Sequence, residues 1–99
     1  MPREILLNAF SMNTVGHVSP GLWTHPRDRS PEYRRLATWT GLAAMLERGM
    51  FDGLFLADVL GVYDVHRGGK DGALRHAVQL PINDPLLLVP AMAHGTRHL

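Results

Sequence analysis

A helical pattern followed directly by a buried strand pattern constrains the fold of this chain more than any other feature. Ser30-Pro31 predicts a helix start, because serine can cap free N–H groups and proline suits the first helical position. Apolar residues then recur every three or four positions, which predicts a helix over residues 31–48 with one apolar stripe. That stripe consists of Leu36, Trp39, Ala43, Leu46 and Met50. We expect Trp39 and Leu46 to pack in the core, and we expect Gly49 to end the helix in a left-handed cap.

Two short apolar runs predict strands. Residues 54–57 are apolar without interruption and stop at Asp58, which is typical of a parallel strand covered on both faces. Residues 5–10 form a similar run in which Asn8 is the one polar interruption. The Asn8 amide either points into the mouth of a barrel or bonds a neighbouring strand, since an unpaired buried amide costs about 1–3 kcal/mol.

The second half of the chain predicts a long loop and another helix. Residues 59–83 contain several glycines and one short helical pattern near residues 73–77. Asp84-Pro85 repeats the cap-plus-proline signature and predicts a helix over residues 85–97, kinked at Pro90 and weakened at Gly95.

The resulting order is strand, helix, strand, helix, which is typical of α/β proteins with a parallel sheet. Both strand-to-helix connections are long, and the helix-to-strand connection is short. In (β/α)₈ barrels the strand-to-helix loops form the catalytic face. A doubly wound sheet fits nearly as well, because its ligands also bind at the carboxyl ends of the strands.

The length limits how much of such a fold the chain can hold. It has 99 residues, whereas a complete (β/α)₈ barrel takes about 250. Two strands also leave an unpaired parallel edge. We therefore expect residues 1–99 to be the N-terminal part of one barrel domain, truncated before the third strand. As an isolated piece it should be prone to aggregation.

The composition excludes several classes of protein. The chain has no cysteine, so it has no disulfide and no thiolate metal site. A net charge of +1 with scattered arginines argues against a nucleic-acid partner. No apolar run approaches the ~20 residues of a membrane span, and no signal-peptide pattern is present. We expect a cytoplasmic protein without a membrane partner.

Short strings spread over nearly the whole chain carry a family resemblance. The strongest is Phe55-Leu56-Ala57-Asp58-Val59-Leu60-Gly61-Val62-Tyr63-Asp64. The others are Leu7-Asn8-Ala9-Phe10, Val15-Gly16-His17, Ser19-Pro20-Gly21-Leu22-Trp23, His25-Pro26, Glu47-Arg48-Gly49, Phe51-Asp52-Gly53, Asn83-Asp84-Pro85-Leu86 and Val89-Pro90-Ala91-Met92. Together they resemble the nitrilotriacetate and dibenzothiophene-sulfone monooxygenase family of bacterial-luciferase-like flavin enzymes.

The resemblance implies an FMN-dependent monooxygenase with a luciferase-like (β/α)₈ TIM barrel. Such enzymes use reduced FMN, supplied by a separate NAD(P)H-dependent flavin reductase, and dioxygen to oxygenate small organic substrates such as amino-polycarboxylates and sulfones. The flavin carries the chemistry, while the protein binds and orients the reactants. A homo-oligomer is compatible with the full-length protein. The fragment alone is expected to be inactive.

One flavin contact of the family carries over to this chain. It is the aspartate that ends the second strand, Asp58, whose carboxylate can accept from a flavin ring N–H or a ribityl hydroxyl. The alternative is an ordinary loop or cap aspartate. The other flavin ligands of the family lie beyond residue 99, so the resemblance identifies no catalytic residue here. Gly95 departs from the pattern expected of the family.

Two further groups of residues are candidates for a site. The first long loop, residues 11–30, is a candidate wall for substrate or flavin, and the alternative is a surface loop with packed aromatics. Its residues of interest are Met12, Asn13, His17, Trp23 and His25. His94 and His98 have the i, i+4 spacing that can share a metal on a helix. No third ligand supports them, so we expect surface histidines and no metal.

Two other functions remain open. The chain could be a non-catalytic remnant or binding module that completes a barrel with another chain. It could also be a small α/β domain with an unrelated ligand.

Overall fold

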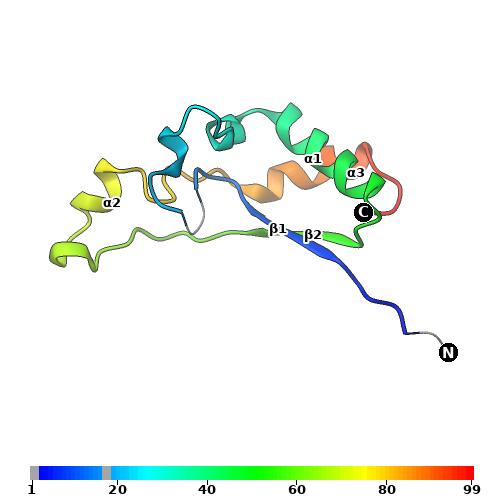
Figure 1. Cartoon of the computed structure of the whole chain (residues 1–99), viewed down its shortest axis with the longest axis horizontal. Helices are drawn as coiled ribbons and strands as arrows, with labels where there is room; N and C mark the ends of the chain where they lie inside the picture. The colour runs from blue at the N-terminus through cyan, green and yellow to red at the C-terminus, as the bar shows by residue number, and fades with distance from the viewer. Residues whose placement is uncertain (1–2, 17–18) are drawn as a thin grey trace.

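The computed structural model describes residues 3–16 and 19–99, and it contains a two-stranded parallel sheet with helices against one side (Figure 1). The longer elements are β1 (Asn8–Met12), α1 (Leu36–Arg48), β2 (Gly53–Ala57), α2 (Asp71–Arg75) and α3 (Val89–His94). Four short 3₁₀ helices join them: η1 (Leu22–Thr24), η2 (Ser30–Arg34), η3 (His66–Gly68) and η4 (Pro85–Leu88). The predicted order of strand, helix, strand and helix is confirmed.

The two strands run parallel, with a register that extends from Asn8 opposite Gly53 to Met12 opposite Ala57. This confirms the parallel strand expected over residues 54–57. The first strand begins later than the expected residues 5–10, because β2 offers no partner before Gly53. Asp52 fixes this start: the Leu7 N–H donates to its carboxylate at 2.7 Å, and its own N–H donates to the Leu7 carbonyl at 2.8 Å.

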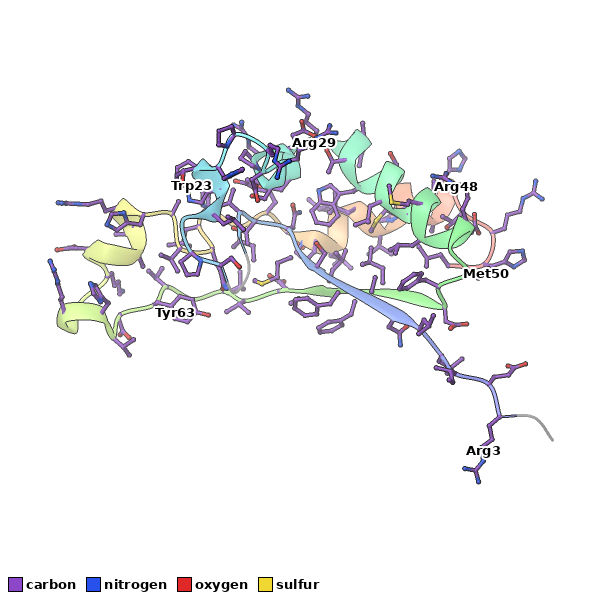
Figure 2. The ribbon with its side chains drawn as sticks, viewed as in Figure 1. Arg3, Trp23, Arg29, Arg48, Met50 and Tyr63 are labelled. Carbon is purple, nitrogen blue, oxygen red and sulfur yellow. The ribbon has the colours of Figure 1, made fainter. Side chains whose placement is uncertain are left out.

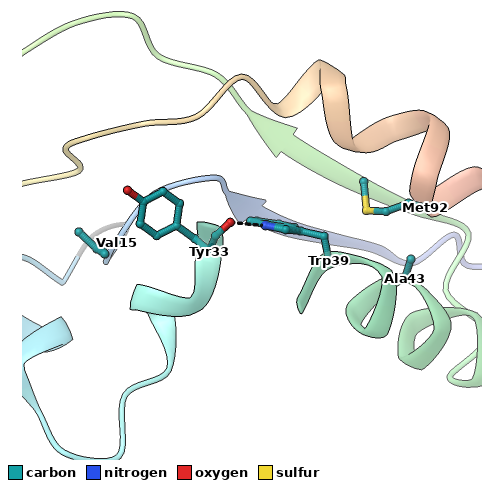
Figure 3. Close-up of a cluster of buried hydrophobic side chains, with 5 residues drawn as sticks. All are labelled: Val15, Tyr33, Trp39, Ala43 and Met92. Atoms are coloured by element: carbon teal, nitrogen blue, oxygen red, sulfur yellow. Dashed lines mark hydrogen bonds between the residues drawn. The ribbon is translucent and has the colours of Figure 1, made fainter. Parts of the chain in front are cut away.

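The two faces of the sheet differ in what covers them. Leu54 and Leu56 pack against a cluster of buried side chains, and Figure 3 shows the members of this cluster. The cluster consists of Val15, Tyr33, Trp39, Ala43 and Met92. On the opposite face, the rings of Phe10 and Phe55 lie 5.4 Å apart between centroids and remain 51% and 59% exposed. Within the described residues the helices cover one face of the sheet, and the face of Phe10 and Phe55 is open, as expected for a piece of a barrel. In a (β/α)₈ barrel, where the helices lie outside, the open face corresponds to the interior.

The helix expected over residues 31–48 is interrupted at Arg35, whose backbone is extended (φ −97°, ψ 124°). Ser30 does not act as the cap, because its backbone N–H and its hydroxyl both donate to the Asp28 carboxylate. Because of the break, the Tyr33 carbonyl lies outside the hydrogen-bond pattern of α1. This carbonyl accepts a 2.7 Å hydrogen bond from the Trp39 indole N–H. Trp39 therefore fixes the bend between η2 and α1.

The core role expected of Trp39 and Leu46 is confirmed. Trp39, Ala43 and Leu46 are buried, whereas Leu36 is 53% and Met50 is 84% exposed. Leu36 is the first residue of α1, and Met50 lies two residues beyond its last residue.

The end of α1 also differs from expectation. Gly49 has φ −78°, and the left-handed residue is Met50, with φ 57°. The Met50 N–H bonds the Glu47 carbonyl and the Phe51 N–H bonds the Leu46 carbonyl, each at 3.0 Å. These two bonds define a Schellman motif, which requires its left-handed residue one position after the cap.

The second half of the chain follows the prediction with shifted boundaries. Residues 73–77 were expected to be helical, and α2 covers Asp71–Arg75. The helix expected over residues 85–97 splits into η4 and α3, because Pro90 starts a new helix instead of kinking one. Asp84 is the predicted cap and accepts from the Leu86 N–H at 3.0 Å.

The C-terminal boundary of α3 is earlier than expected. The helix ends at His94, with Gly95 as its cap. Within the described ranges, no helix combines the length and the apolar character that a membrane crossing requires.

Candidate functional site

The carboxyl ends of β1 and β2 meet at one edge of the sheet. Met12 pairs with Ala57 as the last pair of the register, so Asn13 and Asp58 leave the sheet at neighbouring positions. Parallel α/β folds bind ligands at this edge, because the strand-to-helix loops gather there.

Asp58 is the candidate that the sequence identifies, and it follows the last residue of β2. Its side chain is exposed, and within residues 3–16 and 19–99 its carboxylate forms neither a hydrogen bond nor an ion pair. A cap or turn aspartate would accept from a nearby backbone N–H, as Asp84 does for Leu86. The geometry therefore leaves the Asp58 carboxylate free to accept from a ligand.

Asn13 occupies the corresponding position after β1 and is 1% exposed. Its backbone carbonyl accepts a 3.0 Å hydrogen bond from the Asn83 N–H. The side-chain Oδ1 is buried and has no hydrogen-bond partner among the described residues. A buried acceptor left unpaired costs about 1–3 kcal/mol, so this edge of the sheet lacks a donor.

The two long loops, residues 11–30 and 59–83, contact one another beyond this edge of the sheet. The Thr14 hydroxyl donates to the Pro81 carbonyl at 2.7 Å, and the Trp23 indole N–H donates to the His76 carbonyl at 3.3 Å. Together with the bond between Asn13 and Asn83, these contacts join residues far apart in sequence into one continuous wall.

A polar pair that the sequence did not predict lies in the second loop. The Tyr63 hydroxyl donates a hydrogen bond of 3.2 Å to Gln79 Oε1. Gln79 and nearby Ala77 have φ values of 56° and 48°. Strained backbone of this kind is concentrated at functional sites. Neither residue belongs to a periodic pattern, so only the string that contains Tyr63 pointed to this region.

The other candidate residues of the first loop have structural roles or lie outside the residues that the structure describes. Met12 is buried, and Trp23 packs against the core cluster. His25 Nδ1 accepts from the Arg27 N–H at 3.2 Å and stabilises a turn. His17 lies outside the described residues.

Asn8 lies at the N-terminal end of β1, which is the edge opposite to Asp58. Its side-chain oxygen would lie 2.6 Å from a Cβ atom at Gly53, so the amide covers that glycine closely. The structure therefore does not bring Asn8 together with Asp58 and Asn13.

The two histidines do not share a helix in the structure. His94 is the last residue of α3, and His98 lies beyond it, where its backbone N–H donates to Glu47. No group of three metal-binding side chains occurs within residues 3–16 and 19–99.

Groups with shifted pKa values lie away from the strand ends. The hydrogen bond and charge of Arg29, 2.8 Å away, lower the pKa of Glu32, and the Ser30 hydroxyl lowers the pKa of Asp28. Backbone hydrogen bonds from Arg97 and His98 lower the pKa of Glu47. These groups stabilise η2 and the end of α1, and we assign them no part in the site.

Sequence comparison finds relatives over the whole chain. It is 56% identical to the long-chain alkane monooxygenase of Geobacillus thermodenitrificans (strain NG80-2) and 52% identical to the dimethyl-sulfide monooxygenase of Hyphomicrobium sulfonivorans. Both alignments cover 100% of this chain but only 22% and 21% of those proteins. The chain thus spans about a fifth of the length of these relatives. No protein-family model matches it.

Structural comparison gives the same result. The crystal structure of long-chain alkane monooxygenase (LadA) superposes with a TM-score of 0.93, covering 100% of this chain and 23% of the other. The structure of DmoA from Hyphomicrobium sulfonivorans gives 0.89, covering 98% and 21%. A riboflavin lyase (RcaE) at 24% identity and a TM-score of 0.81 supports the fold alone.

These comparisons identify the fold and the kind of relative. The chain has the architecture of the N-terminal β-α-β-α portion of a luciferase-like (β/α)₈ barrel, which is incomplete within these residues. The resemblance to luciferase-like monooxygenases is confirmed at that general level, since the relatives are named as monooxygenases. Neither is named for nitrilotriacetate or dibenzothiophene sulfone.

Proposed function

We propose that this chain is the N-terminal part of a luciferase-like, two-component monooxygenase that uses reduced FMN and dioxygen to oxygenate a small organic substrate. The main support is 56% identity over all 99 residues to a named monooxygenase. The activity belongs to a protein of the length of these relatives, and the 99 residues alone are inactive.

The residues at the carboxyl edge of the sheet fit a flavin. The carboxylate of Asp58 is unpaired within the described chain and can accept from a ring N–H or a ribityl hydroxyl. The unpaired Oδ1 of Asn13 indicates that a donor is needed to complete the same edge. The open face of Phe10 and Phe55 provides apolar surface on the side of the sheet that becomes the barrel interior.

The charge of Asp58 also limits how a reduced flavin can lie. Reduced FMN supplies the electrons for oxygen activation, and its ring carries negative charge on one side. Like charges at close range repel strongly in a site of low dielectric constant. Asp58 would therefore hold the flavin by accepting from a donor on the part of the ring away from that charge.

The docked loops have a separate role at this edge. Trp23 and Thr14 link the first loop to the second and exclude water from one side of the site. Tyr63 and Gln79 present a hydroxyl and an amide within the same wall, and these groups are suited to orienting a polar substrate atom.

The substrate class, the reductase and the location complete the proposal. Relatives named for long-chain alkanes and dimethyl sulfide favour a small, largely apolar substrate. The narrower relationship to nitrilotriacetate and dibenzothiophene-sulfone enzymes rests on the sequence strings, above all the one from Phe55 to Asp64. A separate flavin reductase supplies FMN in the cytoplasm, where NAD(P)H is present.

A chimera tests the proposal. The 99 residues replace the matching segment of the Geobacillus long-chain alkane monooxygenase, and alkane oxidation is measured with reduced FMN supplied by a reductase. Because the two segments share one fold at a TM-score of 0.93, we expect a folded protein that retains flavin-dependent oxidation. A folded chimera that binds no reduced FMN would refute the proposal.

The open sheet face supports a second candidate, a non-catalytic module that completes a barrel with another chain. Phe10 and Phe55 must be covered by something in the mature protein. Co-expression of the 99 residues with the Geobacillus enzyme lacking its matching segment distinguishes the two. Assembly without oxidation would favour the module, whereas assembly that restores oxidation would favour the enzyme.

A further inference from the structure

Two cavities lie next to one another in the lobe formed by η3 and α2, which extends away from the sheet at one end of the molecule (Figure 1). Each has a volume of about 350 Å³ or slightly less. They share three wall residues: His66, Gly72 and His76. The two spaces are therefore neighbouring compartments of one region.

The first cavity is cationic. Arg67 and Arg75 line it, and Asp71 is the one carboxylate among its lining residues. In the described part of the chain neither guanidinium forms an ion pair, and a salt bridge joins Arg29 to Glu32 instead. Figure 2 shows nitrogen-bearing side chains projecting around this lobe. Guanidinium groups bind planar oxyanions with paired hydrogen bonds, so this compartment suits an anionic group.

The second cavity is apolar. Pro20, Ala73, Val78 and the ring of Tyr63 line it, and the first of these comes from the other long loop. Ala73 is buried, so this part of the lining is packed against the rest of the protein. An alkyl or aryl group would gain free energy here by leaving water.

Gly72 lies between the two cavities and packs closely against His66. A Cβ atom at this position would lie 3.0 Å from Cδ2 of His66, closer than ordinary contact allows. A side chain at this position would displace the imidazole of His66, which lines both cavities. Gly72 therefore leaves room for the His66 ring between the two compartments.

We propose that these compartments form a binding site for a small amphipathic anion, with the oxyanion at Arg67 and Arg75 and the apolar body beside Tyr63 and Val78. Carboxylates and sulfonates share the required chemistry. Neither compartment includes Asp58 or Asn13, but Tyr63 and His76 also belong to the docked loops, so the site lies beside the proposed active site.

Binding is tested by calorimetric titration of the full-length protein without flavin. The probes are octanoate and octane-1-sulfonate. Two control ligands are octan-1-ol, which lacks the negative charge, and acetate, which lacks the alkyl chain. We expect both amphipathic anions to bind at least tenfold more tightly than octan-1-ol and acetate. Equal affinity for octanoate and octan-1-ol, or no binding of either anion, would overturn the proposal.

Substitutions then assign the two compartments. Arg75→Gln should weaken octanoate binding at least tenfold and leave octan-1-ol binding unchanged, whereas Arg48→Gln on the exposed surface of α1 is the matched control. Gly72→Val should remove the preference for octanoate over acetate, since it displaces His66. Equal losses in the Arg75 and Arg48 variants would mean that general charge attracts the anion and that this site does not exist.

Discussion

The Glu47 carboxylate accepts a hydrogen bond of 2.7 Å from the backbone N–H of His98, 51 positions further along the chain. The Arg97 N–H donates to the same oxygen. One side chain at the end of α1 thus holds the segment that follows α3, and it takes the place of the helical turn that the sequence had predicted for residues 95–97.

This contact predicts a pH-dependent stability. The backbone hydrogen bonds lower the pKa of Glu47 below its ordinary value of 4.5 in the folded state. The resulting stabilisation is present above the unfolded pKa and is lost as the pH falls through the folded pKa. Melting temperatures of the full-length protein measured from pH 6 to pH 3 should show a wild-type advantage over Glu47→Gln that shrinks below about pH 4.5. Glu4→Gln serves as the control, and an advantage that stays constant with pH would contradict the prediction.

The left-handed Met50 predicts a stabilising substitution. A residue with a Cβ atom in this conformation loses about 1–2 kcal/mol relative to glycine, and the Met50 side chain is 84% exposed. Met50→Gly should therefore raise the free energy of unfolding by about 1 kcal/mol in a denaturant titration.

Met45→Gly is the matched control for that substitution. Met45 is also exposed, but it lies inside α1, where glycine lowers stability by about 1 kcal/mol. If both variants lost stability, the Schellman geometry at the end of α1 would be wrong.

The indole of Trp39 predicts a larger loss. Trp39→Phe keeps an aromatic ring in the core but removes the 2.7 Å hydrogen bond to the Tyr33 carbonyl. The unpaired carbonyl should cost about 1–3 kcal/mol, in addition to the lost packing. The equivalent substitution at Trp23 removes a longer bond of 3.3 Å to the His76 carbonyl and should cost less. Urea titration of both variants checks the order, and a reversed order would contradict the assigned role.

The open sheet face predicts the behaviour of the isolated 99 residues. Phe10 and Phe55 are exposed side by side, so the isolated chain should associate. Light scattering should show less association for a Phe10→Ser, Phe55→Ser double variant. Leu54→Ser, on the helix-covered face, should instead unfold the chain. A monomeric wild-type chain with a cooperative melt would contradict this prediction.

The sequence predicted features that depend on local periodicity. The parallel strand before Asp58 and the buried centre of α1 followed from apolar patterns that the fold preserves. The element order followed for the same reason, and it was enough to locate the carboxyl edge of the sheet.

Other features depend on contacts between distant residues, and periodicity does not record them. The break at Arg35 lies within a continuous helical pattern and is fixed by the bond between Trp39 and Tyr33. Gly49 was the obvious left-handed residue, yet the Schellman bonds place that conformation at Met50. The pairing of Tyr63 with Gln79 requires a particular path of the second loop, which no local signal predicts.

Titration of the full-length protein with reduced FMN under anaerobic conditions tests the flavin assignment most directly. Asp58→Ala should weaken binding at least tenfold, because a hydrogen bond to a charged group contributes about 1.5–3 kcal/mol and every 1.4 kcal/mol is a factor of ten. Asp64→Ala, an exposed aspartate of the same loop, should bind as the wild type does. Unchanged affinity in Asp58→Ala, in a variant with wild-type stability, would contradict the role of this carboxylate at the flavin.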